Sequence, residues 1–413
     1  MQTNLSLNGT WDFVADLDPK YHAQQLSYAL RETNRRHWLK APVPGVWQKY
    51  GDRYDLFEGV GWFAREFEMQ TFTDSTKVLI RFGGVNYLCR IFLNGKEVGG
   101  HEGGYTEFSV DVTQAILPGK NLLAVRVDNR ACVTKWPPVM GYFNYGGIHR
   151  DVTLEILDGP CLSNLRISAL PTESADGILR FSGAVIQNQQ KLTVEINCGG
   201  AKQSLQVNHN GTFQGELKVP TIEPWSPENP KLYAANISLF HEQTLLDQKT
   251  LDCGFRRVEI QKGRIFLNGQ ERKLKGICYV YDSPSSGLVM TNEQTRQDIA
   301  LFKDLGVNTI RSHYPLPGHF YRACDQAGIM VWIEPPIYCY HPPKTETNTA
   351  FANPPHRKLA FQMAAEMILT ARNHPCVIIY GIGNECNTEH PEAESFFREL
   401  CGSESPPFKS VRG

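Results

Sequence analysis

GVNTIRSHYPLPGHFYRACDQAGIMVWIE, residues 306–334, is the stretch that decides the fold of the C-terminal part of this chain. An apolar strand pattern at 308–311 is followed by a helical pattern at 318–327 and by a second strand pattern at 329–333. This order is typical of two parallel strands that are joined by a right-handed helical crossover. The stretch therefore predicts an α/β architecture with a parallel sheet.

The same alternation continues on both sides of this stretch. Further strand patterns lie at 273–280 and 377–382, and further helical patterns at 292–305, 356–373 and 391–400. The result is four successive βα units, whereas a closed (β/α)8 barrel has eight and typically takes about 250 residues. Only 156 residues are available in 258–413, so we predict the N-terminal half of such a barrel.

Before residue 258 the pattern is that of β-structure. Short alternating segments such as KVLIRF and NLLAVRVDN, separated by Gly, Asn and Asp, are typical of an antiparallel sandwich or barrel. Asn94-Gly95 predicts a two-residue hairpin, because both positions tolerate positive φ. A second all-β stretch, of a size that suits an immunoglobulin-like sandwich, follows. We predict domains at 1–158, 159–257 and 258–413.

Composition limits the classes of partner and compartment. The formal net charge of −1 provides no basic surface for nucleic acid or for an acidic membrane, and no run approaches the roughly 20 apolar residues of a membrane span. The eleven cysteines include no close CxxC pair, which favours free thiols in a reducing compartment. The N-terminus, MQTNLSLNGTWDF, lacks a basic region followed by an apolar run. We therefore expect the cytoplasm.

Polar or aromatic residues follow every predicted barrel strand, at the edge where such barrels place their active sites. These strand ends carry a family resemblance. GVNTIRSHYP with FYRACDQAGIMVWIE, and RNHPCVIIYGIGNEC, resemble signatures of glycoside hydrolase family 2, which contains β-galactosidases, β-glucuronidases and β-mannosidases. LNGTWDF, EGVGWFAREF, HEGGYTEFSVDVT and FNYGGIHRDV are similar to its sugar-binding jelly roll, and WSPENPKLY with GFRRVEI to its immunoglobulin-like domain. The likeness implies a retaining exo-β-glycosidase and says little about the sugar.

The resemblance also implies roles for individual residues. A retaining glycosidase needs two carboxyl groups about 5 Å apart, one as nucleophile and one as acid and then base. By resemblance Glu385 is the general acid/base and Asn384 binds the sugar 2-hydroxyl. Arg311 and His313 match positions that line the subsite for the cleaved sugar. Taken alone, Asn-Glu also fits a loop or a helix cap, and His313 also fits a core histidine.

Two strand ends depart from the family pattern. After the first barrel strand the family usually shows an Asn-Arg-His-Glu type of sequence, whereas this chain has Cys278 to Asp282, so we predict Asp282 as a substitute hydroxyl acceptor. After the third strand, Tyr338 and Tyr340 replace the carboxylate and histidine that bind magnesium in typical β-galactosidases. A hard cation requires oxygen ligands, usually carboxylates, so we expect no metal there and no other cofactor.

The family's nucleophile belongs to the seventh barrel strand, and the resemblance ends at about Leu400, before the tail CGSESPPFKSVRG. Half a parallel barrel exposes a strand edge and apolar helix faces, which favour association into a homo-oligomer. We expect a chain that holds its half barrel poorly and hydrolyses no β-glycoside at a useful rate. The alternative is a non-catalytic carbohydrate-binding or pseudo-enzyme fragment, which the jelly roll and the missing nucleophile also fit.

Overall fold

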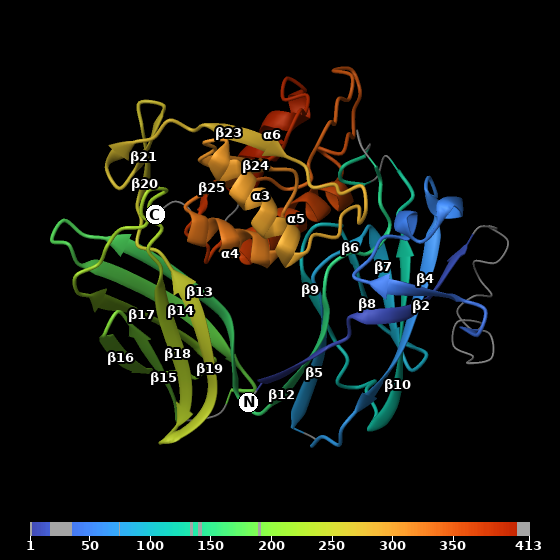
Figure 1. The fold of residues 1–413 in the computed structure, drawn as a ribbon, viewed down its shortest axis with the longest axis horizontal. Helices are drawn as coiled ribbons and strands as arrows, with labels where there is room; N and C mark the ends of the chain where they lie inside the picture. The colour runs from blue at the N-terminus through green and yellow to red at the C-terminus, as the bar shows by residue number, and fades with distance from the viewer. Residues whose placement is uncertain are drawn as a thin grey trace.

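The computed structural model describes residues 2–16, 35–73, 75–132, 135–138, 143–188 and 191–402. Two β-sandwiches stand side by side, and an α/β unit lies across one end of both (Figure 1). The dissimilar tail, 403–413, lies outside the described residues. Within the described ranges, no helix combines the length and apolar character that crossing a membrane requires.

The N-terminal sandwich consists of antiparallel strands in two main sheets, of order β1-β12-β5-β9 and β3-β2-β4-β10-β7-β8, with the short pair β11-β6. The strands are β1 (Gln2–Ser6), β2 (Gly9–Asp16), β3 (Leu39–Val43), β4 (Val60–Met69), β5 (Thr76–Phe82), β6 (Val85–Asn86), β7 (Leu88–Leu93), β8 (Lys96–Glu102), β9 (Phe108–Asp111), β10 (Gly119–Asp128), β11 (Gly147–Ile148) and β12 (Val152–Asp158). Two 3-10 helices, η2 (Trp47–Lys49) and η3 (Asp52–Tyr54), precede β4.

Alternating side chains build the core of this sandwich. In β5 every second residue is buried, which places one face of the strand against the opposite sheet. Phe13, Trp47 and Phe63 are fully buried and contact one another. The predicted hairpin joins β7 to β8, and Asn94 and Gly95 have φ values of 52° and 85°. Positive φ at both positions is what a tight type I′ turn requires.

The second sandwich has seven strands, the number of an immunoglobulin constant-type domain. They are β13 (Cys161–Pro171), β14 (Gly177–Ile186), β15 (Leu192–Cys198), β16 (Ala201–Gln206), β17 (Thr212–Val219), β18 (Tyr233–His241) and β19 (Thr244–Cys253). They form antiparallel sheets of order β13-β14-β17 and β16-β15-β18-β19. The inner faces enclose an aliphatic core around Leu179, Val194 and Phe255.

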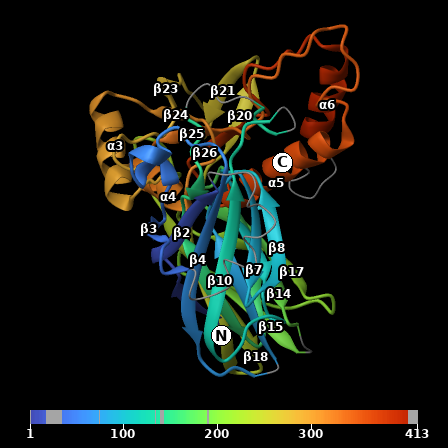
Figure 2. The ribbon, with the colours of Figure 1, turned by 90° about the vertical axis from the view of Figure 1, so that its right-hand side faces the viewer.

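The α/β unit has four parallel strands in the order β23-β24-β25-β26, each followed by a helix. The elements are β23 (Gly276–Tyr279), α3 (Asn292–Asp304), β24 (Thr309–Ser312), α4 (Gly318–Ala327), β25 (Met330–Ile333), α5 (Pro354–Ala371), β26 (Val377–Tyr380) and α6 (Pro391–Gly402). Helices α3 and α6 lie on opposite flanks of the sheet (Figure 2). This arrangement confirms the predicted sandwich, immunoglobulin-like sandwich and partial barrel.

The helix ends follow from local chemistry. Thr291 and Gln294 form a capping box at the start of α3, and Gly328, with φ 70°, ends α4. Helix α5 begins at Pro354, two residues before the predicted start. The first turn of a helix tolerates proline because its missing N–H has no partner there, and the Asn353 side chain accepts a hydrogen bond from His356 N.

One small sheet was not predicted. Strands β20 (Val258–Gln261), β21 (Arg264–Leu267) and β22 (Gln270–Glu271) form an antiparallel sheet before the first barrel strand. Its turns, Lys262-Gly263 and Asn268-Gly269, have positive φ throughout. These two glycine-containing pairs were the available sequence signal.

Both sandwiches contact the helices of the half barrel. Trp225, which is fully buried, donates from its indole nitrogen to the carbonyl of Asp325 in α4 at 2.8 Å. On the other sandwich, His101 Nε2 lies 3.0 Å from a carboxylate oxygen of Glu366 in α5. Trp136 donates from its indole nitrogen to the carbonyl of His356 at 3.0 Å. These contacts fix the sheet relative to both sandwiches.

Candidate active site at the strand ends

Arg311, in β24, is at the centre of a polar cluster at the C-terminal edge of the parallel sheet. Its guanidinium donates to both carboxylate oxygens of Glu334, at 2.8 and 3.0 Å, and to Asn384 Oδ1 at 2.6 Å. The guanidinium carbon lies 5.0 Å from the centroid of the Trp332 ring. Hydrogen bonding to Glu334 raises the pKa of Arg311 above its ordinary value. Arg311 therefore remains a cation that joins three strand ends.

Glu334 is the buried anion of this cluster. It directly follows β25, and its side chain is 1% exposed. Besides Arg311, His313 approaches it, with Nε2 at 3.3 Å from Oε2. A buried carboxylate is tolerated only when it is paired and hydrogen-bonded, and a bidentate arginine provides both. Sequence reasoning considered Glu334 as support for the site or as the charge partner of a nearby arginine, and it left Trp332 out of the site. The parallel strand order places both beside Arg311.

Asn384 lies in the loop after β26, where its backbone is held against the preceding strand end. Its N–H donates to Ile337 O at 2.9 Å, and its carbonyl accepts from Cys339 N at 3.0 Å. Since its side-chain oxygen accepts from Arg311, the side-chain NH₂ remains as the donor of this amide. An oriented amide donor is what binding a sugar hydroxyl requires.

Glu385, the next residue, is exposed and has a φ of 50°. A non-glycine residue in the left-handed region is held there by its surroundings at a cost of about 1–2 kcal/mol, and such strain concentrates at functional sites. Glu385 lines an open cleft of about 570 Å³ with Ile382, Cys386 and Phe397. Glu394 lines the same cleft, but its carboxylate is paired with Arg398 of α6 at 2.8 Å.

Asp282 follows β23 at the same edge of the sheet and is exposed. Its Oδ1 accepts a hydrogen bond from the hydroxyl of Tyr145, in the N-terminal sandwich, at 2.8 Å. Tyr145 is 3% exposed, and sequence reasoning did not single it out. The only available signal was its position in FNYGGIHR. Asp282 is thus joined to the N-terminal sandwich rather than to Arg311.

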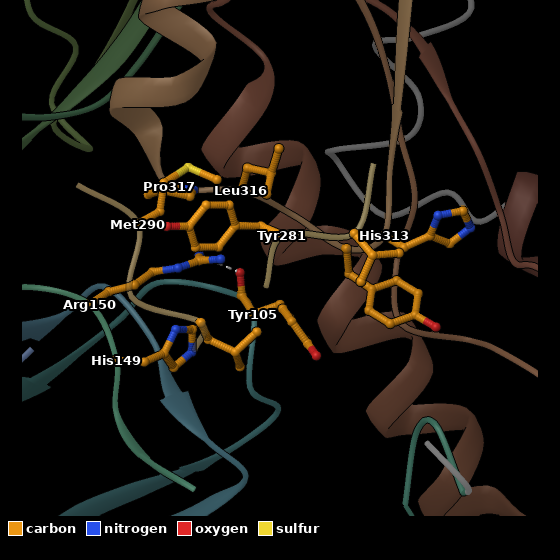
Figure 3. Close-up of a pocket in the computed structure, with 11 residues that line it drawn as sticks. Tyr105, His149, Arg150, Tyr281, Met290, His313, Leu316 and Pro317 are labelled. Carbon is orange, nitrogen blue, oxygen red and sulfur yellow. Dashed lines mark hydrogen bonds between the residues drawn. The ribbon is translucent and has the colours of Figure 1, made fainter. Parts of the chain in front are cut away.

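The N-terminal sandwich also supports the loop that carries His313. Arg150 donates to the carbonyl of Tyr105 at 2.7 Å and to the carbonyl of Pro315 in that loop. Arg150 and Tyr105 line a small cavity of about 20 Å³ between the sandwich and the barrel loops, together with His149 and Tyr281 (Figure 3). Burial lowers the pKa of His149 to about 3, so its ring is neutral near neutrality. The loop after β24 is therefore held in place by Arg150 of the N-terminal sandwich.

The position where typical β-galactosidases bind magnesium has aromatic residues here. The hydroxyl of Tyr340 accepts a hydrogen bond from Ala350 N at 2.8 Å, and its ring packs on Trp136 and Phe351. Burial raises the pKa of Tyr338, and the nearby Cys339 and Glu385 raise it further. Two phenol side chains do not provide the carboxylate oxygens that a hard cation usually takes. Among the described residues, no group of three or more His, Cys, Asp or Glu side chains could hold a metal ion.

The sequence-predicted residues thus fall into three places. Arg311, His313 and Asn384 gather around Glu334. Glu385 borders the open cleft on the side of α6. Asp282 lies at the junction with the N-terminal sandwich. All three places adjoin the C-terminal edge of one parallel sheet, where barrel active sites form.

Three family models match the chain in sequence order. Residues 5–158 match "Glycosyl hydrolases family 2, sugar binding domain", residues 170–256 match "Glycosyl hydrolases family 2", and residues 258–401 match "Glycosyl hydrolases family 2, TIM barrel domain". Together they account for nearly all of the described residues.

Individual proteins agree with these matches. The β-galactosidase of Thermoanaerobacter pseudethanolicus is 32% identical over 83% of this chain and 46% of its own length. The β-glucuronidase of Bacteroides fragilis is 26% identical over 96% of the chain and 58% of its own length. A β-galacturonidase structure from Eisenbergiella tayi, bound to galacturonate, superposes with a TM-score of 0.84 at 28% identity, covering 99% of this chain and 70% of that one. The chain spans about half the length of the curated relatives that it matches.

Proposed function

Because the chain belongs to glycoside hydrolase family 2, we propose that it carries the acid/base portion of a retaining exo-β-glycosidase site for O-glycosidic bonds. Glu385 is the general acid/base and Asn384 binds the 2-hydroxyl of the cleaved sugar. Arg311 and His313 line the subsite. The observation that carries the proposal is the adjacency of an oriented amide and a strained, exposed glutamate at the end of β26.

The geometry supports a separate role for each of these residues. Glu334 pairs with Arg311, and Arg311 donates to Asn384, so the amide oxygen is occupied and the amide NH₂ is left as the donor for a ligand. Glu385 borders open space large enough for a sugar and its leaving group. In a retaining mechanism this residue protonates the leaving oxygen and then deprotonates the attacking water. Positioning of this kind accounts for the backbone strain at Glu385.

Neither Glu334 nor Glu394 is free to act as the nucleophile, and Asp282 is joined to Tyr145 of the N-terminal sandwich. Glu334 is bound to Arg311, and Glu394 is bound to Arg398. We therefore propose that these 413 residues bind β-glycosides and hydrolyse them very slowly or not at all. A purely carbohydrate-binding fragment is the second candidate, and the same missing carboxylate favours it.

Binding and turnover of nitrophenyl β-galactoside and β-glucuronide, measured on the 413-residue chain, test the proposal. We expect ligand signals in saturation-transfer NMR that Asn384→Ala abolishes, without turnover. Absence of both binding and turnover would contradict the glycosidase site. Robust turnover that Glu385→Gln removes would support the acid/base role and contradict the incomplete pair.

We also propose a reducing compartment and a homo-oligomeric state for this chain. All eleven cysteines are free thiols, including Cys198 and Cys253, whose sulfur atoms lie 4.0 Å apart. Unpaired thiols at this separation support a reducing compartment such as the cytoplasm.

Strand β26 is an edge strand of the four-stranded sheet, which supports a homo-oligomer. Light scattering coupled to size-exclusion chromatography tests the assembly, and a clean monomer would contradict it.

A further inference from the structure

The N-terminal sandwich places a side chain at the barrel strand ends. The hydroxyl of Tyr145 lies 2.8 Å from Asp282 Oδ1, although the two residues are 137 positions apart in sequence. Tyr145 is 3% exposed, whereas Asp282 is exposed. The contact therefore joins a buried donor of one domain to an open carboxylate of another.

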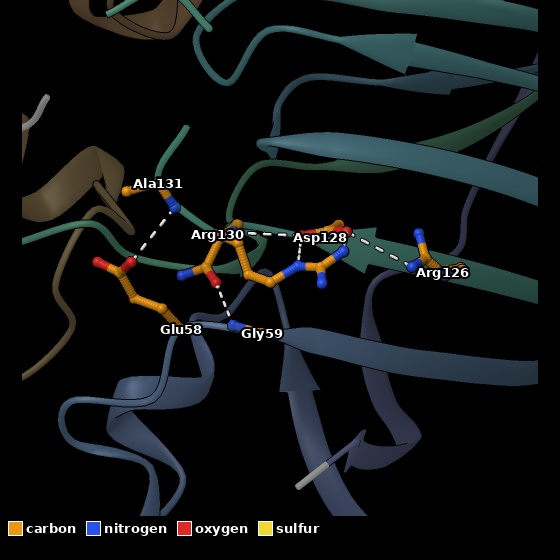
Figure 4. A network of polar contacts seen from close by, with 7 residues as sticks. Glu58, Gly59, Arg126, Asp128, Arg130 and Ala131 are labelled. Carbon is orange, nitrogen blue, oxygen red and sulfur yellow. Dashed lines mark hydrogen bonds and ion pairs between the residues drawn. The ribbon is translucent and has the colours of Figure 1, made fainter. Parts of the chain in front are cut away.

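The backbone that carries Tyr145 is held on both sides. Asn144 O accepts from Asn129 Nδ2 at 2.8 Å, and Gly146 N donates to Gln48 Oε1 at 3.0 Å. Asn129 is itself bonded twice to Gly59, through its backbone N–H at 3.1 Å and its side-chain oxygen at 2.9 Å. Gly59 lies beside the network of polar contacts around Asp128 and Arg130 (Figure 4). A side chain on so fixed a backbone acts as a rigid support for its partner.

The ring of Tyr145 also packs closely against the barrel loop that contains Gly287. A Cβ placed on Gly287, in the loop after Asp282, would lie 2.8 Å from Tyr145 Cε1. Gly287 has a φ of 57°, so any other residue there would be strained as well as crowded. The glycine lets the barrel loop close over the tyrosine ring, which brings the hydroxyl to Asp282.

Asp282 retains hydrogen-bonding capacity beyond this contact. Oδ1 accepts from Tyr145, and Oδ2 has no hydrogen-bond partner among the residues described in the structure. Burial and the adjacent Asp282 raise the pKa of Tyr145, so the phenol stays a donor. A carboxyl group with one oxygen anchored and the other without a partner has acceptor capacity left for a hydroxyl.

An exposed aromatic ring lies against Tyr145, the residue that donates to this carboxylate. Phe143 is 51% exposed, and its ring centroid lies 5.6 Å from that of Tyr145, with the planes tilted by 31°. Sugars present apolar C–H faces beside their hydroxyl groups, and aromatic rings in ligand sites cover such faces. Phe143 and Asp282 thus provide the two kinds of contact that a sugar ring requires.

Building on the proposed function, we infer that Asp282, Tyr145 and Phe143 form a sugar-hydroxyl subsite shared between the two domains. Asp282 accepts a hydrogen bond from a hydroxyl, Tyr145 is the positioning residue that orients Asp282, and Phe143 covers the sugar's C–H face. The subsite selects a neutral hydroxyl at this point of the ligand. A carboxylate group placed there would be repelled by Asp282.

Saturation-transfer NMR titrations of the 413-residue chain with methyl β-galactoside and its monodeoxy analogues test this inference. Tyr145→Phe removes only the hydroxyl and should weaken binding of the parent glycoside about tenfold, as should Asp282→Asn. Both variants should leave the affinity for one deoxy analogue unchanged, namely the one that lacks the hydroxyl bound by Asp282. A merely structural role would weaken every analogue alike.

Tyr281→Phe is the matched control, because the hydroxyl of Tyr281 donates to Val289 O at 3.1 Å and does not reach Asp282. This variant should bind all of the glycosides as the parent chain does. If Tyr145→Phe and Asp282→Asn bind normally while Asn384→Ala does not, the shared subsite is refuted and the proposed function survives. If the parent chain binds no glycoside, the proposed function fails, and the subsite fails with it.

Discussion

Replacing Glu334 with alanine removes the buried anion of the strand-end cluster. The Glu334 side chain is 1% exposed and receives two hydrogen bonds from Arg311, at 2.8 and 3.0 Å. His313 lies 3.3 Å from the same carboxylate. The substitution leaves a partly buried guanidinium, whose own side chain is 27% exposed, without its counter-charge.

The magnitude follows from this burial. Removing one partner of a buried ion pair costs about 3–5 kcal/mol, whereas an exposed pair contributes about 0–1 kcal/mol. For a domain of 150 to 250 residues, each kcal/mol corresponds to about 2–4 °C in Tm, so Glu334→Ala should lower the melting temperature of the barrel transition by about 6–20 °C. Such a loss is a large share of the stability of an ordinary domain.

Urea unfolding followed by tryptophan fluorescence measures this loss, because Trp332 packs on the Arg311 guanidinium and reports locally. Glu394→Ala is the control, since Glu394 and Arg398 are an exposed pair within one helix. A double variant, Glu334→Leu with Arg311→Met, should recover much of the stability because both charges are gone. Equal losses for Glu334→Ala and Glu394→Ala would refute the reasoning.

Three further predictions concern other parts of the chain. His149, with its pKa lowered by burial from 6.5 to about 3, binds fewer protons folded than unfolded between these values, so stability should fall by up to about 1.4 kcal/mol per pH unit as pH decreases from 6.5 toward 3. His149→Gln should flatten this dependence in urea titrations, and an unchanged slope would count against it. Trp225→Ala should cost about 3–5 kcal/mol in the same assay, because the fully buried ring and its bond to Asp325 are both lost. Glu385 has a φ of 50°, so the Glu385→Gly variant should be about 1 kcal/mol more stable than the Glu385→Ala variant. The reverse order in thermal melts would exclude backbone strain at this position.

Much of the fold could be read from periodicity and turn residues. Helix α4 has the predicted bounds, Gly318–Ala327, because an apolar face and a left-handed Gly328 define it locally. The barrel strands, of four residues each, were predicted because their apolar runs alternate with helical patterns. The strands of the small sheet β20-β21-β22 are equally short but mostly half-buried or exposed, and no helix separates them, so they give no comparable signal.

In the site, residues that belong to a sequence motif were predicted, and a residue whose contact depends on the packing of two domains was not. Arg311, His313 and Asn384 were predicted because they match the family's motifs, and the parallel strands that carry these motifs end at one edge of the sheet. Tyr145 was not found, because its contact with Asp282 depends on how two domains dock. Nothing in the local sequence of FNYGGIHR records which barrel loop lies above it. Glu334 was considered only as support for the site or as the charge partner of a nearby arginine, whereas its pairing with Arg311 organises the cluster.

The role of Glu385 can be tested most directly by a crystal structure of the chain with a non-hydrolysable sulfur-linked β-glycoside. The acid/base assignment predicts the Glu385 carboxylate at about 2.6–3.2 Å from the position of the glycosidic oxygen, which sulfur occupies in this ligand. It also predicts the sugar 2-hydroxyl on the Asn384 side-chain NH₂. A sugar bound elsewhere, or at the strand ends with Glu385 turned away from the linkage atom, would contradict the assignment.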